Sequence, residues 1–220
     1  MEILYSDEHI VVCAKPAGIL SQGDEKGSEN MISLLSKELS SDIYPVHRLD
    51  RNTGGVMVYA KNAKAAAKMS AVIENKDEFL KEYLAVVEGI PENEGELKDL
   101  LYKSARDNKA YVVKKARKGV KEALLHYQLK ETAEKDKKTL SLILVRLFTG
   151  RFHQIRVQFA SRKMPLAGDG KYGSKDNGCE LALWSHRIAF RHPFSGEKMN
   201  FISYPGNEYP WDLFDSIKPM

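Results

Sequence analysis

The chain has 220 residues, of which 43% are hydrophobic and 29% charged, and its formal net charge is +4. This length allows one sizeable core, or two lobes that share it, and the composition is typical of a soluble globular protein. No apolar run approaches the roughly 20 residues of a membrane-spanning helix. Because residues 1–5 lack the features of a signal peptide, we expect a cytoplasmic protein. Two cysteines, Cys13 and Cys179, are too few for a disulfide framework and are expected to be buried free thiols.

The first half of the chain alternates short strands with helices. We expect strands in this half over residues 3–6, 9–14, 55–60 and 79–90. Apolar residues at helical spacing predict helices over 30–39 and 63–74, the second with Asn62 as its N-cap. Residues 20–30, rich in Gly, Asp, Glu and Ser, are expected to form a loop.

The second half is rich in β-formers. We expect strands here over residues 110–113, 123–129, 140–148, 181–191 and 199–203. Residues 153–161 follow a turn at Gly150 and are predicted to form a helix. Since strands outnumber helices and mostly follow one another directly, we predict an α+β fold with antiparallel pairing, in one domain over residues 1–220.

Basic residues are concentrated in two stretches. Between residues 103 and 121 there are eight Lys or Arg and one acid, Asp107, and between 137 and 168 there are seven bases and no acid. Such runs are usually solvated hairpin surfaces. A folded chain that separates charge in this way can also present a basic face to a phosphate backbone.

The most informative stretch is residues 47–56, His-Arg-Leu-Asp-Arg-Asn-Thr-Gly-Gly-Val. It places Asp50 between Arg48 and Arg51, and opposite charge nearby keeps a carboxylate ionised at neutral pH. Such a group can act as a nucleophile or base, and the two glycines that follow allow close approach of a backbone or a ligand. Taken alone, this pattern is more often a surface turn with a screened ion pair. If the segment is a strand, Arg48 and Asp50 lie on one face of it.

Residues 47–56 resemble the H-R-L-D-x-x-T-S-G-L motif of pseudouridine synthases, in the branch named for ribosomal large subunit pseudouridine synthase A. Only Gly54, for Ser, and Val56, for Leu, differ. Further segments resemble the family in the same order, at residues 15–18, 81–89, 150–157, 168–173 and 188–193. Other departures are Phe152, Gln158, Lys163 and the pair Trp184-Ser185, which replaces a frequent His-Ala; they concern which RNA is bound rather than the reaction.

The resemblance implies a fold and a reaction. The fold is a bent, predominantly antiparallel mixed sheet with flanking helices and a central catalytic cleft. Because the Lys-Pro-Ala-Gly segment starts at Lys15, we expect the form without an N-terminal RNA-binding domain. The reaction breaks the C1′–N1 bond of a uridine and rejoins the uracil through C5, and it requires no cofactor and no metal. The expected partner is structured RNA, ribosomal or transfer RNA, and the expected state is a monomer.

The resemblance also implies the catalytic residues. Asp50 matches the family's aspartate, with three possible roles: attack at C1′, addition at C6, or abstraction of the C2′ proton. Arg156 matches its basic partner, and pairing would keep the pKa of Asp50 low. Tyr83 matches the tyrosine that stacks on the target base and takes the C5 proton, although a strand tyrosine is otherwise more often a core residue.

Six residues are candidates for RNA binding, Lys15, Arg48, Arg51, Arg151, His153 and Gln154. The resemblance suggests that Arg48 fills the space left by an extruded uridine. The residues Arg151, His153 and Gln154 either shape the RNA groove or position the motif turn, and His153 can equally be a structural histidine. Lys15 is either a cleft-rim or a structural residue.

Other functions fit the sequence less well. The six histidines show no metal-ligand spacing, which argues against metal-dependent hydrolysis. An aspartyl-phosphate enzyme would bring further carboxylates to bind Mg²⁺, and Asp50 is the only carboxylate residue between positions 43 and 61. The main alternative is a catalytically silent RNA-binding module on the same fold.

Overall fold

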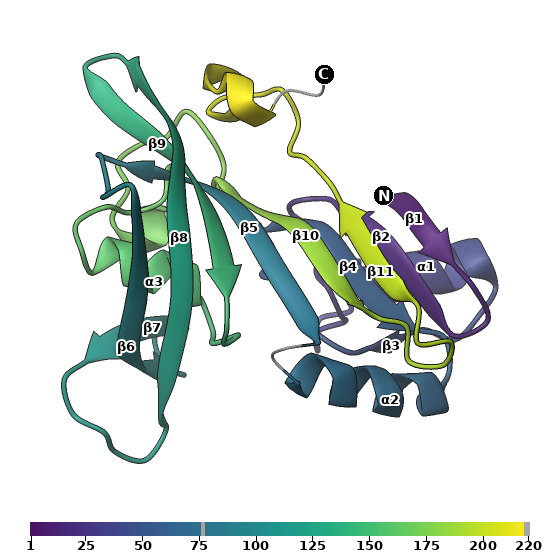
Figure 1. Cartoon of the computed structure of the whole chain (residues 1–220). Helices are drawn as coiled ribbons and strands as arrows, with labels where there is room; N and C mark the ends of the chain where they lie inside the picture. Colours follow the sequence, from purple (N-terminus) through teal and green to yellow (C-terminus); the bar gives the residue numbers. More distant parts are fainter. Residues whose placement is uncertain (76–77, 218–220) are drawn as a thin grey trace. The chain divides into compact units, whose positions relative to one another are not determined.

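The computed structural model describes residues 1–75 and 78–217, in two compact units (Figure 1). Unit 1 comprises Met1–Lys81 and Trp184–Pro205, and unit 2 comprises Glu82–Leu183 and Gly206–Met220. A single catalytic domain over the whole chain stays a prediction. In the described residues, no helix combines the length and the apolar character needed to cross a membrane.

Unit 1 is built on a mixed, mostly antiparallel sheet. Its strands are β1 (Glu2–Ser6), β2 (Ile10–Lys15), β3 (Tyr44–Pro45), β4 (Gly54–Ala60), β10 (Leu183–Arg191) and β11 (Lys198–Ile202). Strands β1, β2, β4 and β10 are neighbours in this order, while β3 pairs with β4 and β11 with β10. The β4–β10 pairing is parallel, through Trp184 opposite Gly54 and Ser185 opposite Gly55, and the other pairings are antiparallel.

Two capped helices belong to unit 1. Helix α1 (Met31–Leu39) begins after Asn30, and α2 (Ala63–Glu74) begins after Asn62. Each asparagine side chain accepts a hydrogen bond from a backbone N–H in the first turn, at Ser33 and Ala65. This is the capping predicted at Asn62, and both predicted helices are confirmed within one residue. The main core of the unit consists of Ile10, Val12, Val56, Val58, Met69, Phe79, Ile188 and Phe190.

Unit 2 is built on an antiparallel sheet with the order β5-β9-β8-β6-β7. These strands are β5 (Phe79–Glu88), β6 (Glu94–Ser104), β7 (Lys109–Val113), β8 (Val120–Lys135) and β9 (Lys138–Leu147). Helix α3 (Gln154–Ala160) contacts β6, β7 and the short helix η1 (Gly170–Tyr172). Around Val157 of α3, a small core collects Leu101, Ala110, Ala123 and Tyr172.

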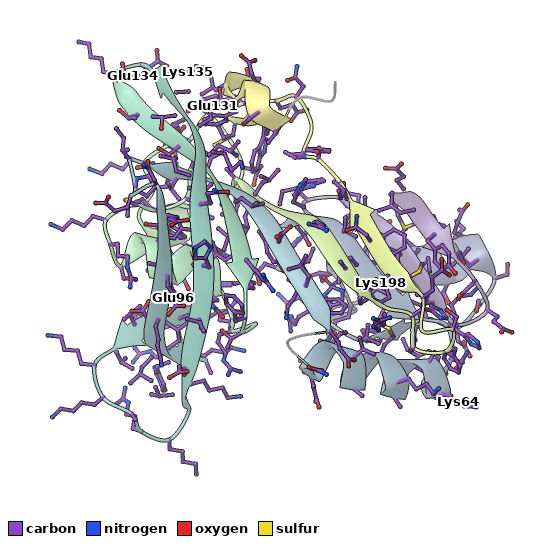
Figure 2. All side chains as sticks on the ribbon, in the orientation of Figure 1. Lys64, Glu96, Glu131, Glu134, Lys135 and Lys198 are labelled. Carbon is purple, nitrogen blue, oxygen red and sulfur yellow. The ribbon has the colours of Figure 1, made fainter. Side chains whose placement is uncertain are left out.

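A buried ring and the carboxylate of Glu131 help to attach the C-terminal segment to the rest of unit 2. Phe214 lies between the short helices η2 (Trp211–Leu213) and η3 (Asp215–Ile217) and is fully buried. The carboxylate of Glu131 accepts hydrogen bonds from the backbone N–H groups of Asp215 (3.2 Å) and Ser216 (2.9 Å). Charged side chains such as Glu134, Lys135, Lys64 and Lys198 lie on the exposed surface of their units (Figure 2).

The predicted α+β class is confirmed, with two strands missed, the two-residue β3 and the longer β6. Strand β6 carries acids and lysines at five of its eleven positions, and only Leu97 and Leu101 are deeply buried, so the alternation of a strand is hard to recognise. Strand β8 is longer than the predicted 123–129 because both of its ends are polar and still pair with neighbours. The cysteines are free thiols as expected, although Cys179 is only half-buried.

His47 connects the segment before β4 to the sheet of unit 1. Its Nε2 accepts a hydrogen bond of 3.1 Å from the backbone N–H of Val58, and its ring contacts Phe79 edge-on. Burial, assisted by the positive charge of Lys81, lowers the pKa of His47 from 6.5 to about 3. The ring is therefore neutral at physiological pH and serves as a hydrogen-bond acceptor.

This acceptor role predicts a pH-dependent stability. Between about pH 6.5 and pH 3 the unfolded chain binds a proton at His47 that the folded chain does not, so the free energy of unfolding falls as the pH is lowered. His47→Gln keeps an acceptor for Val58 without a titrating group. We expect urea unfolding at pH 7 and pH 4.5 to show a loss of stability smaller by about 2 kcal/mol in the variant than in the wild type. An equal loss in both proteins would contradict this assignment.

Candidate functional site

Asp50 lies at the start of a tight turn in unit 1. The backbone N–H of Thr53 donates to the carbonyl of Asp50 at 3.1 Å, which closes the turn. The preceding Leu49 is buried, and both its N–H (3.0 Å) and its carbonyl (2.9 Å) hydrogen-bond to the hydroxyl of Ser21. Residues 46–53 are irregular, so the strand that would place Arg48 and Asp50 on one face is not formed; Arg48 is exposed and Asp50 half-buried. The Asp50 turn (residues 50–53) is thus fixed on its N-terminal side by backbone hydrogen bonds.

Lys15 anchors the Asp50 turn through its buried ammonium group. Its side chain is completely buried, and its Nζ donates to three carbonyl oxygens, of Pro16 (2.8 Å), Ile19 (2.6 Å) and Arg51 (3.0 Å). The Arg51 carbonyl also accepts from the N–H of Gly18 (2.9 Å), and Arg51 Nε donates to the Gly18 carbonyl (2.9 Å). The Lys-Pro-Ala-Gly loop and the Asp50 turn are therefore joined into one structure.

The charge of Lys15 is linked to that of Asp50. Burial lowers the pKa of Lys15 to about 8, and the negative charge of Asp50 opposes this decrease. An ammonium group that donates three hydrogen bonds inside the protein has no proton left for a ligand. Lys15 was a candidate for RNA binding, and the structure instead supports the structural role that the sequence left open.

Arg156 has a carboxylate partner that the sequence did not assign. In unit 2, its Nε and Nη2 donate to the two oxygens of Asp169, at 2.7 and 2.8 Å. Asp169 is 1% exposed and Arg156 is 9% exposed, and the guanidinium lies 5.1 Å from the ring centre of Tyr172. A buried arginine requires a buried acid, and the Gly168-Asp169 segment that resembles the family supplies it. The bidentate pair orients the guanidinium firmly within unit 2.

Two further candidates, Gln154 and Arg151, hold the turn before α3. Gln154 accepts from the Thr149 hydroxyl (2.8 Å) and the Arg151 N–H (3.0 Å), while its own amide donates to the Leu124 carbonyl. Arg151 Nε donates to the backbone of β8, at the Glu122 carbonyl. These contacts support the positioning role among the two alternatives for Arg151 and Gln154.

His153 has the surroundings of a structural histidine. It is buried, has a left-handed backbone (φ 52°), and its Nδ1 shares a hydrogen bond of 3.0 Å with the Tyr172 hydroxyl. That hydroxyl accepts from the N–H of Ala110 on β7 (2.8 Å). Through its hydroxyl, Tyr172 therefore links the turn before α3 to strand β7, and its ring lies next to the guanidinium of Arg156.

The predicted catalytic residues are divided between the units. Asp50 belongs to unit 1, together with Lys15, Arg48 and Arg51. Tyr83 and Arg156 belong to unit 2. Tyr83 lies on β5 opposite Val145 of β9 and is 7% exposed, and its role stays a prediction.

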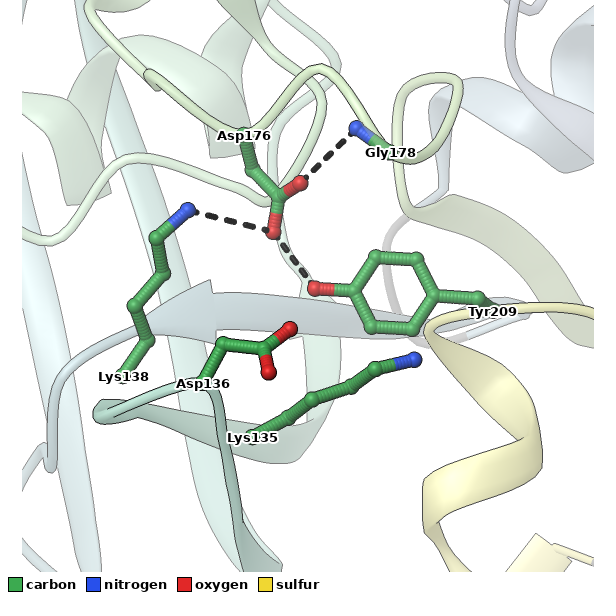
Figure 3. Close-up of a pocket in the computed structure, with 6 residues that line it drawn as sticks. All are labelled: Lys135, Asp136, Lys138, Asp176, Gly178 and Tyr209. Carbon is green, nitrogen blue, oxygen red and sulfur yellow. Dashed lines mark hydrogen bonds and ion pairs between the residues drawn. The ribbon is translucent and has the colours of Figure 1, made fainter.

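A pocket in unit 2 involves none of the predicted residues (Figure 3). It lies beside the β8–β9 turn and is lined by Lys135, Asp136, Lys138, Asp176, Gly178 and Tyr209. The carboxylate of Asp176 accepts from the Tyr209 hydroxyl (2.6 Å) and the Gly178 N–H (2.9 Å), with Lys138 Nζ at 3.9 Å. These contacts attach the C-terminal segment to unit 2, which is a structural role.

The chain resembles known enzymes over most of its length. Residues 9–161 match the family described as RNA pseudouridylate synthase. The tRNA pseudouridine synthase C of Pasteurella multocida is 30% identical, and the alignment covers 97% of this chain and 98% of that protein. The ribosomal large subunit pseudouridine synthase D of Xanthomonas campestris is 32% identical, over 90% of this chain and 63% of that protein.

Solved structures support the fold. The human RNA pseudouridylate synthase domain containing 1 superposes with a TM-score of 0.77 at 21% identity, over 94% of this chain and 83% of that one. The human domain containing 4 gives a TM-score of 0.74, also at 21% identity, over 92% and 87%. With the family match extending over more than half of the residues, the chain belongs to the RNA pseudouridylate synthase family.

Proposed function

We propose that this protein converts specific uridines in structured RNA, transfer or ribosomal, to pseudouridine, with Asp50 as the reactive group. The observation that carries the proposal is the anchoring of the Asp50 turn by the buried ammonium of Lys15. This arrangement holds the backbone of the turn through hydrogen bonds and leaves the Asp50 side chain half-buried. A preorganised carboxylate near a buried cation is what a nucleophile or base requires.

The reaction needs a carboxylate and a basic residue that pairs with it, and it involves no change of oxidation state. The C1′–N1 bond of the uridine breaks, the uracil turns, and C1′ bonds to C5; a proton leaves C5 and N1 gains one, so the product is an isomer of the substrate. Asp50 either attacks C1′, adds to C6 or abstracts the C2′ proton, and each role needs the ionised form. The positive charges of Lys15, Arg48 and Arg51 favour that form.

Arg156 and Tyr83 complete the proposed catalytic set from unit 2. The bidentate pair with Asp169 uses Nε and Nη2 of Arg156 and so fixes the plane of its guanidinium. A planar cation with a fixed orientation is suited to hold a second carboxylate, which is the role we propose toward Asp50. We assign Tyr83 to stacking on the uracil and to the transfer of the C5 proton.

Exposed cations support RNA as the substrate. Among the eight bases between residues 103 and 121 of unit 2, all except Lys109 are exposed. Three of them lie over aromatic rings: Lys103 over Phe152, Lys109 over Tyr172 and Arg117 over Tyr102. Such a surface attracts phosphates without reading sequence. Arg48 of unit 1 is also exposed, as it must be to occupy the place of an extruded base.

The first prediction concerns Asp50. Asp50→Asn removes the charge and keeps the size, so pseudouridine formation in transcribed transfer or ribosomal RNA should fall by at least about 100-fold. RNA affinity, measured by filter binding, should change little. Asp42→Asn changes an exposed carboxylate of the same unit and should leave both quantities unaltered.

Two outcomes would count against the proposal. A wild-type protein that binds RNA tightly and forms no pseudouridine would favour a catalytically silent RNA-binding module. Full activity of Asp50→Asn would show that another group carries the reaction.

The second prediction concerns Lys15. Lys15→Met keeps the aliphatic stem but removes the donor of three hydrogen bonds. We expect the free energy of unfolding to decrease by at least about 2 kcal/mol in urea titrations, because buried carbonyl groups lose a charged donor. We also expect a loss of activity in the protein that remains folded, and Lys37→Met, at an exposed position of α1, is the matched control. A variant as stable and active as the control would contradict the anchoring role.

The third prediction concerns Asp169. Asp169→Asn removes the negative charge from the Arg156 pair, so the buried guanidinium loses the carboxylate that fixes its plane. The unfolding free energy should decrease by about 3 kcal/mol. The kcat of the folded fraction should fall more than KM rises, because the position of Arg156 is what changes. Asp136→Asn, at an exposed carboxylate of the same unit, should change neither value.

A further inference from the structure

Gly54, the first residue of β4, is covered by the indole ring of Trp184. The two residues are direct partners in the parallel pairing of β4 with β10. A Cβ atom at position 54 would overlap Cζ3 of this ring and lie 2.7 and 2.9 Å from Cε3 and Cη2. Heavy atoms do not approach so closely, so the ring occupies the space of a side chain at this position.

The ring is also the nearest obstacle to a side chain at this position. Gly54 is not among the residues with positive φ, so its backbone conformation is open to any residue. The three atoms nearest to a Cβ at this position all belong to Trp184. The neighbouring Gly55 differs in both respects, because its φ is 112° and its Cβ would meet the backbone of Ser185.

This contact lies directly after the Asp50 turn. Thr53, which closes the turn on the Asp50 carbonyl, is 2% exposed and immediately precedes Gly54. On the other side, Ser185 follows Trp184 and donates from its hydroxyl to the Val56 carbonyl at 2.9 Å. The start of β10 therefore holds the start of β4 by the parallel strand pairing, one side-chain hydrogen bond and one ring contact, on the C-terminal side of the turn.

Packing, rather than hydrogen bonding, holds the indole. Its Nε1 is buried and has no hydrogen-bond acceptor within the described part of the chain. The contact of the ring with Gly54 is thus a matter of shape, and another flat aromatic ring can make it.

We propose that Trp184 is a positioning residue for the reaction, and that Trp184 and Gly54 together set the place of the Asp50 turn. The inference rests on the proposed role of Asp50. It also joins the departures from the family motif at positions 54 and 184 into a single change, because a large ring at 184 is compatible only with a glycine at 54.

A double-mutant cycle tests this inference. Gly54→Ser should lower kcat by about 100-fold with a smaller effect on KM, because the added side chain displaces the ring or the turn. Adding Trp184→His to that variant should restore most of the loss, so that the two changes are strongly non-additive. Trp184→Phe should keep most of the activity, since it keeps a flat, although smaller, aromatic ring next to Gly54 and loses an N–H that has no acceptor.

Gly55→Ser is the matched control. Its obstacle is the backbone of Ser185, so Trp184→His should not rescue it. Additive effects of Gly54→Ser and Trp184→His, wild-type activity of Gly54→Ser, or equal rescue of both serine variants would each overturn the inference.

A second readout separates this inference from the proposed function. The chain has two tryptophans, so in a Trp211→Phe background the fluorescence emission reports on Trp184 alone. In this background, Gly54→Ser should shift the emission. The double variant should also unfold at a lower urea concentration than Trp211→Phe alone, whether or not RNA is modified. If the wild type forms no pseudouridine, the proposed function fails, and an unchanged emission in the Gly54→Ser variant would independently show that the ring contact is misassigned.

Discussion

The buried ammonium of Lys15 is the interaction on which the candidate site of unit 1 depends. A buried charge is costly unless it is paired or fully hydrogen-bonded, and Lys15 meets this condition with three backbone carbonyls. One of these belongs to Arg51, inside the Asp50 turn. Any movement of the turn away from Lys15 would therefore leave the buried ammonium without one of its three acceptors. The cost of losing this hydrogen bond makes the turn resistant to displacement.

Unit 2 uses a buried charge for the same purpose with different chemistry. Arg156 is held by the carboxylate of Asp169, and the preceding Gly168 (φ 73°) lets the backbone pass so close to the carbonyl of Glu180 that a Cβ atom at Gly168 would overlap it. A carboxylate fixes the plane of a guanidinium, whereas carbonyls fix only the position of an ammonium. In both units a buried ion thus fixes the geometry of the candidate site. In unit 1 this ion is Lys15, which is close to Asp50, and in unit 2 it is Arg156, itself a predicted catalytic residue.

Local signals predicted most of the fold and far less of the site. Asn62 was recognisable as an N-cap because capping depends on neighbouring residues, and the same holds for most strands. Strand β6 was missed because its pairing with β8 and β7 outweighs a polar sequence, and pairing partners are not local. Resemblance identified Lys15 and Arg156 as site residues, but their partners, the Arg51 carbonyl and Asp169, are set by tertiary contacts that no spacing reveals. The same limit applies to Trp184, which lies 130 residues after Gly54 in the sequence.

The anchoring of the Asp50 turn through its backbone has a consequence for specificity. Lys15, Ser21 and Thr53 bind backbone groups of the segment at residues 49–51, and Arg51 adds a bond from its Nε to the Gly18 carbonyl, so the position of the segment does not depend on the exposed side chains at residues 48 and 52. Arg48 and Asn52 are exposed on either side of Asp50 and can differ without moving the carboxylate. Such a separation allows one catalytic geometry to be combined with different RNA contacts. Gly54 is the exception, because the ring of Trp184 on β10 leaves no room for a side chain at this position.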